Sequence, residues 1–403
     1  MQSKLVRWPR LLVAAISMLF AGVIYAWSVL KAPLGTEFGW TPSQLALNFT
    51  LTLCFFCIGR LIGSKLSKTA SPKVALWVGA VLVAIGFIMA WRLNGSVAML
   101  YISYAGFAGL GIGITYNVVI SSTNAWYPDR KGMCSGVMMM CFGLSSLILG
   151  KVADAMFASE AFGWRKTYMI LGIVIAVIIA VCAFGVRMPE PGTTFPKPQA
   201  KGIQADEGFE PRDYTTSEAL RRSSFWRFFV YSILTSAVGS VVISFARDLA
   251  LSVGAAAALA TTLVGVLSLC NGLGRIIGGF VFDLVGRRKT MIIANIVTII
   301  APLVVFASVT GKSLPLCIAG LCLTGISYGF SPTISSSFVG AFYGMKNFPS
   351  TYSIANMMLI PSSFASTIAG ALLTKTGGYA APFMMLIGFA VVALFINLSI
   401  RRP

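Results

Sequence analysis

Twelve long apolar runs constrain this chain more than any other feature of its sequence. A helix needs about 20 consecutive apolar residues to cross a lipid bilayer, and each run reaches that length. The strands of a membrane barrel, in contrast, are short and alternate polar with apolar residues. The sequence therefore predicts an all-α integral membrane protein with spanning helices at residues 11–33, 44–66, 73–93, 97–123, 133–157, 166–187, 225–246, 255–282, 290–310, 313–340, 349–374 and 380–400.

The scarcity of polar residues excludes a water-soluble protein. Hydrophobic residues make up 57% of the chain and charged residues only 11%, whereas soluble proteins carry about 25% charged residues. Too few polar groups remain to cover the surface of a soluble enzyme, and the apolar content is too high for a disordered chain. We expect the lipid bilayer to cover this surface.

One polar stretch, residues 188–222, interrupts the series of apolar runs and contains five of the 17 prolines. Six runs precede this stretch and six follow it. We therefore expect an N-terminal six-helix bundle at residues 1–187, a central loop at 188–222 and a C-terminal six-helix bundle at 223–403.

The charge of the chain is strongly positive, at +19, but it is not spread evenly over the loops. Lys and Arg gather at both ends of the chain, in the central stretch and in every second loop, which is the bias of cytoplasmic loops. This pattern predicts a protein of the cytoplasmic (inner) membrane with both termini in the cytoplasm, and it explains the positive charge without nucleic acid. The first run follows Lys4, Arg7 and Arg10 as in a signal peptide, but it is too long and lacks a cleavage site.

No enzymatic, metal or cofactor motif stands out. The chain has no histidine, and the Cys54–Cys57 pair lies inside an apolar run without a second pair of ligands. The glycine-rich run at 106–113 follows no strand and predicts close helix packing rather than a nucleotide loop. We expect no catalytic residues, no metal and no cofactor, and the absence of a phosphate-binding loop argues against an ATP-driven pump.

A short motif after the eighth run suggests an internal duplication. Gly279 begins a GxxxDxxGRRK pattern, which is typical of a tight turn between two helices and continues through the residues Asp283, Gly286, Arg287 and Arg288. The loop after the second run keeps the glycine and the basic residues but has Ser67 in place of the acid. One intact and one decayed copy predict two pseudo-symmetric halves.

The 6+6 arrangement with this motif resembles the major facilitator superfamily of transporters. A narrower resemblance, to the oxalate/formate antiporter family and the related monocarboxylate transporters, rests on the segments Tyr25-Ala-Trp27, Gly113-Ile-Thr-Tyr116-Asn117, Asn271-Gly-Leu-Gly-Arg275 and Gly325-Ile-Ser-Tyr328. The resemblance implies that Arg275 binds a substrate carboxylate and that Tyr25, Tyr116 and Tyr328 belong to an aromatic cage around it.

Four positions depart from the pattern of oxalate carriers. The second cation of those carriers, a lysine in the eleventh span, corresponds here to Leu359, and the remaining departures are Ile24, Phe142 and Thr324. With Arg275 as the only central charge, a second carboxylate would enter the cavity unpaired, at a cost of several kcal/mol. We therefore expect monocarboxylates such as formate, pyruvate or lactate to be preferred over oxalate.

Arg275 stands out even without the resemblance. It lies more than two helical turns inside a span, where a charge costs at least about 2.5–3.5 kcal/mol, so such a residue is functional by default. The alternative is a structural arginine bound to backbone carbonyls. Asn271, one turn away, orients the guanidinium, contacts the substrate or bonds to a neighbouring helix. The three tyrosines line a cavity or belong to an interfacial belt, and Asn117 is a weaker candidate for substrate contact.

The remaining polar residues are candidates for gates. Lys151 and Asp154 are spaced to form an ion pair or an outer gate on one helix face, or else to act in binding or proton coupling. Arg60 is close enough to a span end to extend to the surface, and the alternative is a functional role inside the protein. The turn motif, together with Asp129 and Arg130 in the fourth loop, predicts contacts that lock one conformation.

These observations favour a secondary transporter of small organic anions that works by alternating access, through exchange or facilitated diffusion and as a monomer. The alternatives are an oxalate/formate antiporter, a drug or metabolite efflux carrier, and a receptor that binds an anion without moving it.

Overall fold

The structure is a computed structural model that describes residues 2–127, 131–190, 193, 213–344 and 347–401. Within these ranges the chain is helical, without strands. The elements are α1 (Gln2–Ala21), η1 (Gly22–Ala26), α2 (Trp27–Phe38), α3 (Pro42–Thr69), α4 (Pro72–Trp91), α5 (Val97–Leu100), η2 (Tyr101–Ala108), α6 (Gly109–Trp126), α7 (Lys131–Ala158), α8 (Gly163–Cys182), α9 (Thr216–Leu220), α10 (Ser223–Ser252), α11 (Ala257–Thr310), α12 (Leu314–Tyr343), α13 (Phe348–Ala355), η3 (Asn356–Met358), α14 (Leu359–Thr376) and α15 (Ala380–Ser399).

Twelve helical segments of the described chain are long and apolar enough to span a membrane, and each overlaps one of the twelve predicted runs. The prediction of an all-α membrane protein with twelve spans is therefore confirmed. Three spans are interrupted helices: α1, η1 and α2 form the first, α5, η2 and α6 the fourth, and α13, η3 and α14 the eleventh. Large apolar side chains on the outer surface, such as Phe280, Val181 and Phe395, are more than half exposed, as lipid-facing residues must be.

Local sequence signals explain where several spans begin and turn. Thr41 forms a capping box with Gln44 at the start of α3, and the Ser71 side chain caps α4 by accepting from the backbone N–H of Val74; each precedes a proline in the first turn. The eighth and ninth spans both lie in α11, which turns at Gly286, where φ is 72° and ψ is 175°. Only glycine adopts this conformation readily, so the predicted turn at the motif glycine is confirmed.

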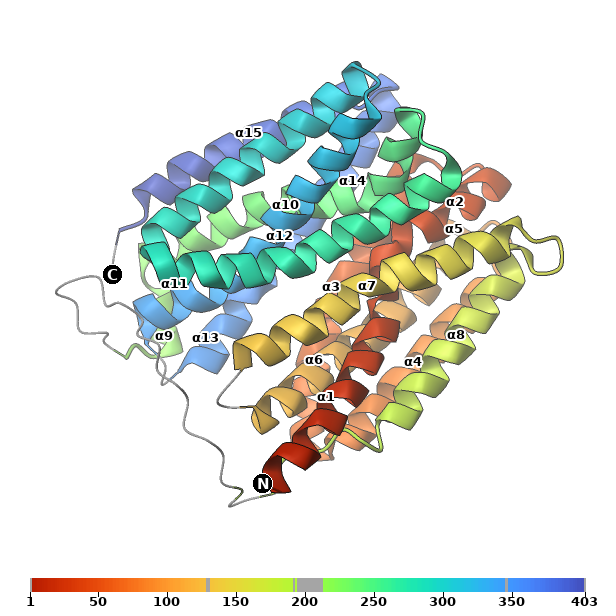
Figure 1. Cartoon of the computed structure of the whole chain (residues 1–403). Coiled ribbons are helices and arrows are strands. Elements are labelled where there is room, and N and C mark those ends of the chain that lie inside the picture. Colours follow the sequence, from red (N-terminus) through yellow and green to blue (C-terminus); the bar gives the residue numbers. More distant parts are fainter. Residues whose placement is uncertain (1, 128–130, 191–192, 194–212, 345–346, 402–403) are drawn as a thin grey trace.

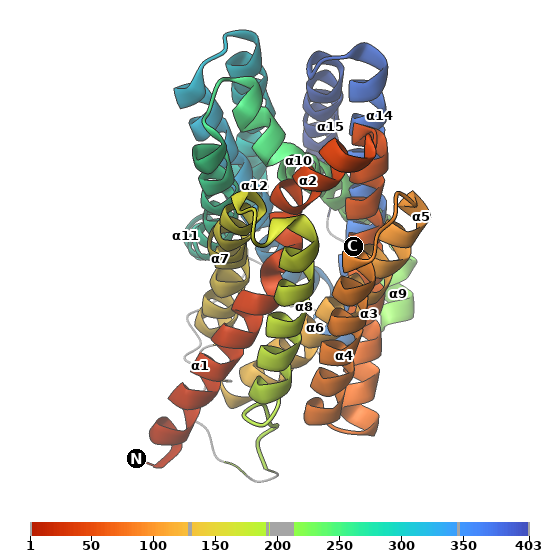
Figure 2. The same cartoon turned by 90° about the vertical axis from the view of Figure 1, so that its right-hand side faces the viewer.

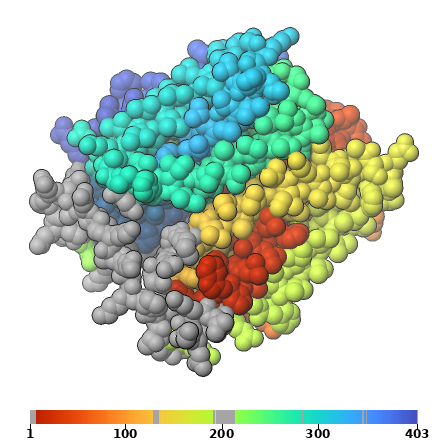
Figure 3. Space-filling model, in the orientation of Figure 1, coloured from red at the N-terminus to blue at the C-terminus, as the bar shows by residue number. Residues whose placement is uncertain are grey.

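The helices form two groups that run along a common axis (Figure 1). The first group, red to yellow, contains α1–α8, and the second, green to blue, contains α10–α15. The groups meet where α7 packs against α11 and where α3 packs against α14; Figure 3 shows the first of these contacts as a seam between yellow and green. Both chain ends lie at one end of the molecule, which we call the termini end; the other, where α2 and α5 lie, is the far end.

Glycines let α6 approach α3 closely. A Cβ atom on Gly113 would lie 2.2 Å from the carbonyl oxygen of Phe56, and one on Gly111 would lie 2.5 Å from the carbonyl oxygen of Gly79 on α4. Neither position has room for a side chain, so the prediction that the glycine-rich run serves close packing is confirmed. Figure 2 shows α3, α4 and α6 side by side along the molecule.

Candidate functional site

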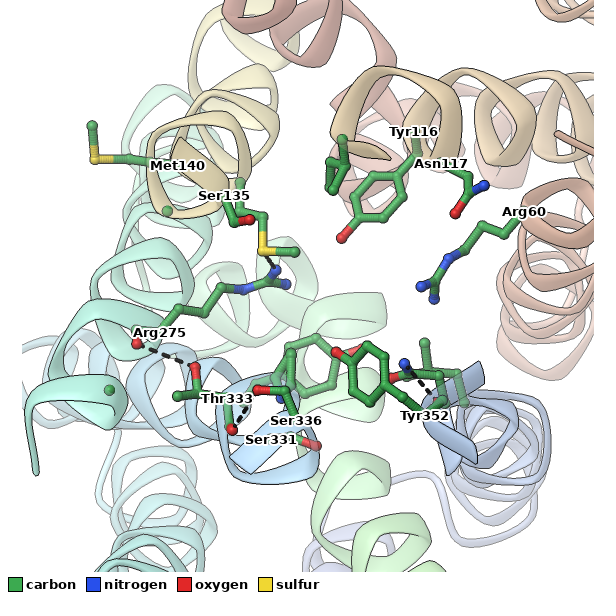
Figure 4. Close-up of a pocket in the computed structure, with 18 of the residues that line it drawn as sticks. Arg60, Tyr116, Asn117, Ser135, Met140, Arg275, Ser331, Thr333, Ser336 and Tyr352 are labelled. Carbon is green, nitrogen blue, oxygen red and sulfur yellow. Dashed lines mark hydrogen bonds between the residues drawn. The ribbon is translucent and has the colours of Figure 1, made fainter. Parts of the chain in front are cut away.

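A pocket of about 700 Å³ lies between the two helix groups. Five of the six predicted substrate-binding residues line it: Tyr25 from η1, Tyr116 and Asn117 from α6, Arg275 from α11 and Tyr328 from α12. The pocket extends towards the termini end, where Phe348 and Tyr352 of α13 line it. Figure 4 shows its polar side chains converging from both groups. The residues that the resemblance indicated therefore share one cavity. Their wide separation in the sequence gave no sign that they would lie together.

Arg275 reaches into this pocket without an acidic partner. Its guanidinium donates to the Sδ of Met139 on α7, and its backbone carbonyl accepts a hydrogen bond of 3.2 Å from the hydroxyl of Thr333. The Nε atom is buried and has no hydrogen-bond partner among the described residues. No Asp or Glu of the described chain lines the pocket. Since a thioether is a weak acceptor, the guanidinium keeps its capacity to bind an anion.

An aromatic cluster forms one wall. The ring centroids of Tyr25 and Phe142 are 5.2 Å apart, those of Tyr116 and Phe142 are also 5.2 Å apart, and Phe56 lies 5.1 Å from Tyr116. These edge-on contacts fix the rings in place. Tyr25 and Tyr328 are only 8% and 7% exposed, so they lie inside the molecule and do not belong to an interfacial belt.

Asn271 lies behind the pocket and not on its surface, which corrects the expectation that it contacts the substrate. It is buried one helical turn before Arg275, beside the side chain of Tyr25, and its Oδ1 atom has no hydrogen-bond partner in the described part of the chain. This position suits an amide that orients its neighbours. Asn117, in contrast, faces the cavity directly.

Arg60 also lines the pocket, which corrects two expectations. Its guanidinium carbon lies 5.4 Å from the ring centroid of Tyr116 and 6.0 Å from that of Phe56, and its Nε atom is buried. The side chain therefore does not extend to the surface, and Arg275 is not the only central charge. The reason is the packing of α3: Gly59 faces α6, which turns the next residue into the cavity.

The predicted ion pair between Lys151 and Asp154 is wrong. Lys151 is exposed, whereas Asp154 accepts hydrogen bonds from Arg247 on α10, at 3.3 Å, and from Thr261 on α11, at 2.9 Å. The spacing of Lys151 and Asp154 along one helix favours a local pair. Partners on two neighbouring helices instead allow both carboxylate oxygens of Asp154 to accept hydrogen bonds. The alternative expectation, that Asp154 belongs to an outer gate, agrees with this position.

A second ion pair accompanies this one at the far end. The Nζ of Lys31 on α2 lies 2.6 Å from a carboxylate oxygen of Asp248 and donates to the carbonyl of Ser244 at 2.9 Å. Lys31 is only 3% exposed. Both pairs join the first helix group to α10 of the second group, so they hold the far end closed. Lys31, Arg247 and Asp248 were not predicted as site residues, because all three lie close to predicted loops.

The predicted gating residues occupy the termini end. Gly279 lines the pocket, Gly286 makes the turn, and the guanidinium carbon of Arg287 lies 4.5 Å from the ring centroid of Phe342. Arg288 is exposed. The side chain of Asp283 and all of Asp129 and Arg130 lie outside the described residues.

Comparisons with known proteins agree with this architecture. The sequence model of the Major Facilitator Superfamily matches residues 10–247 and 228–403. The oxalate:formate antiporter of Oxalobacter formigenes is 26% identical over 347 residues, which cover 85% of this chain and 80% of the antiporter. Monocarboxylate transporter 12 of Mus musculus is 24% identical over 392 residues, covering 91% and 79% of the two chains. A crystal structure of the nucleoside transporter NupG superposes with a TM-score of 0.72 at 11% identity and covers 98% of each chain.

Proposed function

Because the chain belongs to the Major Facilitator Superfamily, we propose that it is a secondary transporter of small organic anions. The observation that carries the proposal is the position of Arg275. Its guanidinium lies in a pocket with no Asp or Glu among the described lining residues, and its hydrogen-bond acceptor there is a thioether. A cation in such surroundings attracts an anion strongly, because little water screens the interaction. The same charge argues against efflux of cationic drugs.

In the proposed binding mode, Arg275 grips a carboxylate with two parallel hydrogen bonds, as the planar guanidinium fork allows. The anion displaces the sulfur of Met139 from the guanidinium. Tyr25, Tyr116 and Tyr328 shape the cavity around the substrate, and Asn117 offers an amide to it. Asn271 orients Tyr25 and the guanidinium from behind.

The proposed mechanism is alternating access, in which residues 1–187 and 223–403 act as two bundles that rock about the central pocket. The Lys31–Asp248 and Asp154–Arg247 pairs close the far end, and the pocket extends towards the termini end. With both termini in the cytoplasm of the cell, as the loop charges predict, this arrangement is the state that admits substrate from the cytoplasm. Release on the other side requires both ion pairs to separate.

Carboxylates are the proposed substrate class. A monocarboxylate such as formate, pyruvate or lactate needs only the single clamp at Arg275, and the apolar Leu359 lines the pocket where oxalate carriers have their second cation. Exchange of oxalate for formate is a second candidate, favoured by the oxalate:formate antiporter among the relatives. A dicarboxylate such as oxalate is not disfavoured by its second charge, because Arg60 lines the same pocket as Arg275.

Counterflow in proteoliposomes tests the proposal. Vesicles loaded with an unlabelled carboxylate should take up the same labelled carboxylate against its gradient, at a rate that depends on the internal anion. The panel comprises formate, lactate, pyruvate and oxalate. Uptake into vesicles without internal anion separates facilitated diffusion from exchange, and uptake driven by a proton gradient would reveal proton coupling. Binding without counterflow for every member would indicate a receptor and contradict transport. No binding of any carboxylate would contradict the substrate class.

A further inference from the structure

The two arginines of the pocket stand in the same short sequence, once in each half of the chain. Gly59-Arg60-Leu-Ile-Gly63 in α3 corresponds to Gly274-Arg275-Ile-Ile-Gly278 in α11. α3 is the second span of the first half, and this part of α11 is the second span of the other half. Arg60 is therefore the repeat-related counterpart of Arg275, in a register that shifts by one residue before the turn motif, where Ser67 corresponds to Asp283.

The packing of the two motifs confirms that they occupy equivalent places. A Cβ atom on Gly59 would lie 2.3 Å from the carbonyl oxygen of Leu110 on α6, the fourth span. A Cβ atom on Gly274 would lie 2.3 Å from the carbonyl oxygen of Ile326 on α12, the tenth span. Each glycine thus presses its helix against the corresponding neighbour, and the arginine that follows it turns towards the pocket.

Both guanidinium groups reach the same cavity from opposite sides, with Tyr116 between them (Figure 4). The ring centroid of Tyr116 lies 5.4 Å from the guanidinium carbon of Arg60, and Tyr116 lines the same pocket as Arg275. Each arginine has a buried Nε atom without a hydrogen-bond partner among the described residues. The lining of the pocket, as far as the structure describes it, offers no carboxylate to either.

We propose that Arg60 is a second anion ligand and that the pocket binds a dicarboxylate, with one carboxylate on each arginine. This inference rests on the proposed transport of small carboxylates. It further specifies that the preferred substrate carries two negative charges. A single carboxylate leaves one half-buried guanidinium of the pocket without a counter-charge. A dianion compensates both cations, removes their mutual repulsion and bridges α3 of one half and α11 of the other.

Dicarboxylates and their monoamides form matched pairs for the test, because an amide replaces one carboxylate without a change in size. Succinate would be compared with succinamate and oxalate with oxamate, at neutral pH where the carboxylates are ionised. Binding to the purified full-length protein would be measured by calorimetry. We expect the dicarboxylate of at least one pair to bind roughly tenfold or more tightly than its monoamide, since pairing a buried charge is worth that much.

Variants assign the second charge to Arg60. Arg60→Gln keeps a polar side chain of similar reach but removes the charge, so it should abolish the preference for the dicarboxylate while the monoamide still binds. Arg60→Lys should retain part of the preference. Lys65→Gln, which removes a charge from an exposed position of the same helix, is the matched control and should leave both affinities unchanged.

Two results would overturn the inference. The first is equal affinity for dicarboxylate and monoamide in the unmodified protein, which needs no variant and so does not depend on folding of a mutant. The second is an unchanged preference in Arg60→Gln that elutes as a single species. In both cases the carboxylates still bind, so the proposed function stands. Absence of binding for both members of every pair would instead contradict the proposed function itself.

Discussion

At the scale of single residues, Arg275 is the side chain that the proposed transporter can least do without. Arg275→Ala removes both the charge and the hydrogen bonds, so the binding free energy of a carboxylate should fall by roughly 2–5 kcal/mol. Arg275→Lys keeps the charge but loses the planar fork and should be impaired as well. Calorimetry on the purified protein and counterflow after reconstitution measure both losses.

A lipid-facing neighbour provides the control for these variants. Leu273 lies on the same helix and is 40% exposed, so Leu273→Ala should leave binding and uptake unchanged. A structural role for Arg275 would appear as aggregation or failure to insert. Near-normal carboxylate uptake by a monodisperse Arg275→Ala protein would contradict its role as a ligand.

The residues of the pocket differ in how far sequence alone could identify them. Arg275 could be identified from the sequence because a charge deep in an apolar run has few structural explanations. Tyr25, Tyr116 and Tyr328 followed from a family resemblance. Arg60 was missed because its distance from the span end allowed it to reach the surface. The signal was present in the repeated Gly-Arg-x-Ile-Gly pattern, which becomes informative once both glycines are seen to face the adjacent helix.

At the scale of helices, the close contact between α3 and α6 should tolerate no side chain at Gly113. A Cβ atom there would lie 2.2 Å from the carbonyl oxygen of Phe56, so Gly113→Ala forces the helices apart. Overpacking of this kind costs typically about 1–3 kcal/mol, and the walls that carry Arg60 and Tyr116 move with it. We expect a lower thermal unfolding temperature in detergent together with weaker anion binding.

Gly388 on α15 is the matched control, since a Cβ atom there meets nothing within 4 Å. Gly388→Ala should be neutral or slightly stabilising, because alanine is favoured over glycine in a helix by about 1 kcal/mol. If Gly113→Ala unfolds at the same temperature as Gly388→Ala, the close contact does not limit stability.

The helices themselves were predictable because a bilayer demands long apolar segments, and their pattern needs no tertiary information. The interruptions at η1, η2 and η3 were not predicted, since the same apolar residues suit a regular and an irregular helix. The Lys151–Asp154 pair failed for a related reason. Spacing along one helix indicates only local neighbours, whereas Asp154 accepts hydrogen bonds from Arg247 and Thr261 on other helices.

At the scale of the whole molecule, two ion pairs hold the far end closed. Lys31 pairs with Asp248 and Asp154 with Arg247, so neighbouring residues of α10 bind opposite charges of the first helix group. Breaking a buried pair by removal of one partner costs about 3–5 kcal/mol. The value here should be smaller, because the Asp248 side chain is 33% exposed. Even a part of this energy shifts an equilibrium between two conformations by one or two orders of magnitude.

Charge reversal of the Lys31–Asp248 pair should therefore open the far end. In Lys31→Asp the two carboxylates repel, and amides near the far ends of α2 and α10 should exchange hydrogen faster with solvent, as measured by mass spectrometry. The double variant Lys31→Asp/Asp248→Lys restores opposite charges and should recover slow exchange. Lys151→Gln removes a charge from an exposed position at the same end and should change nothing. Fast exchange that persists in the double variant would mean that Lys31 supports the local fold and does not act as a gate.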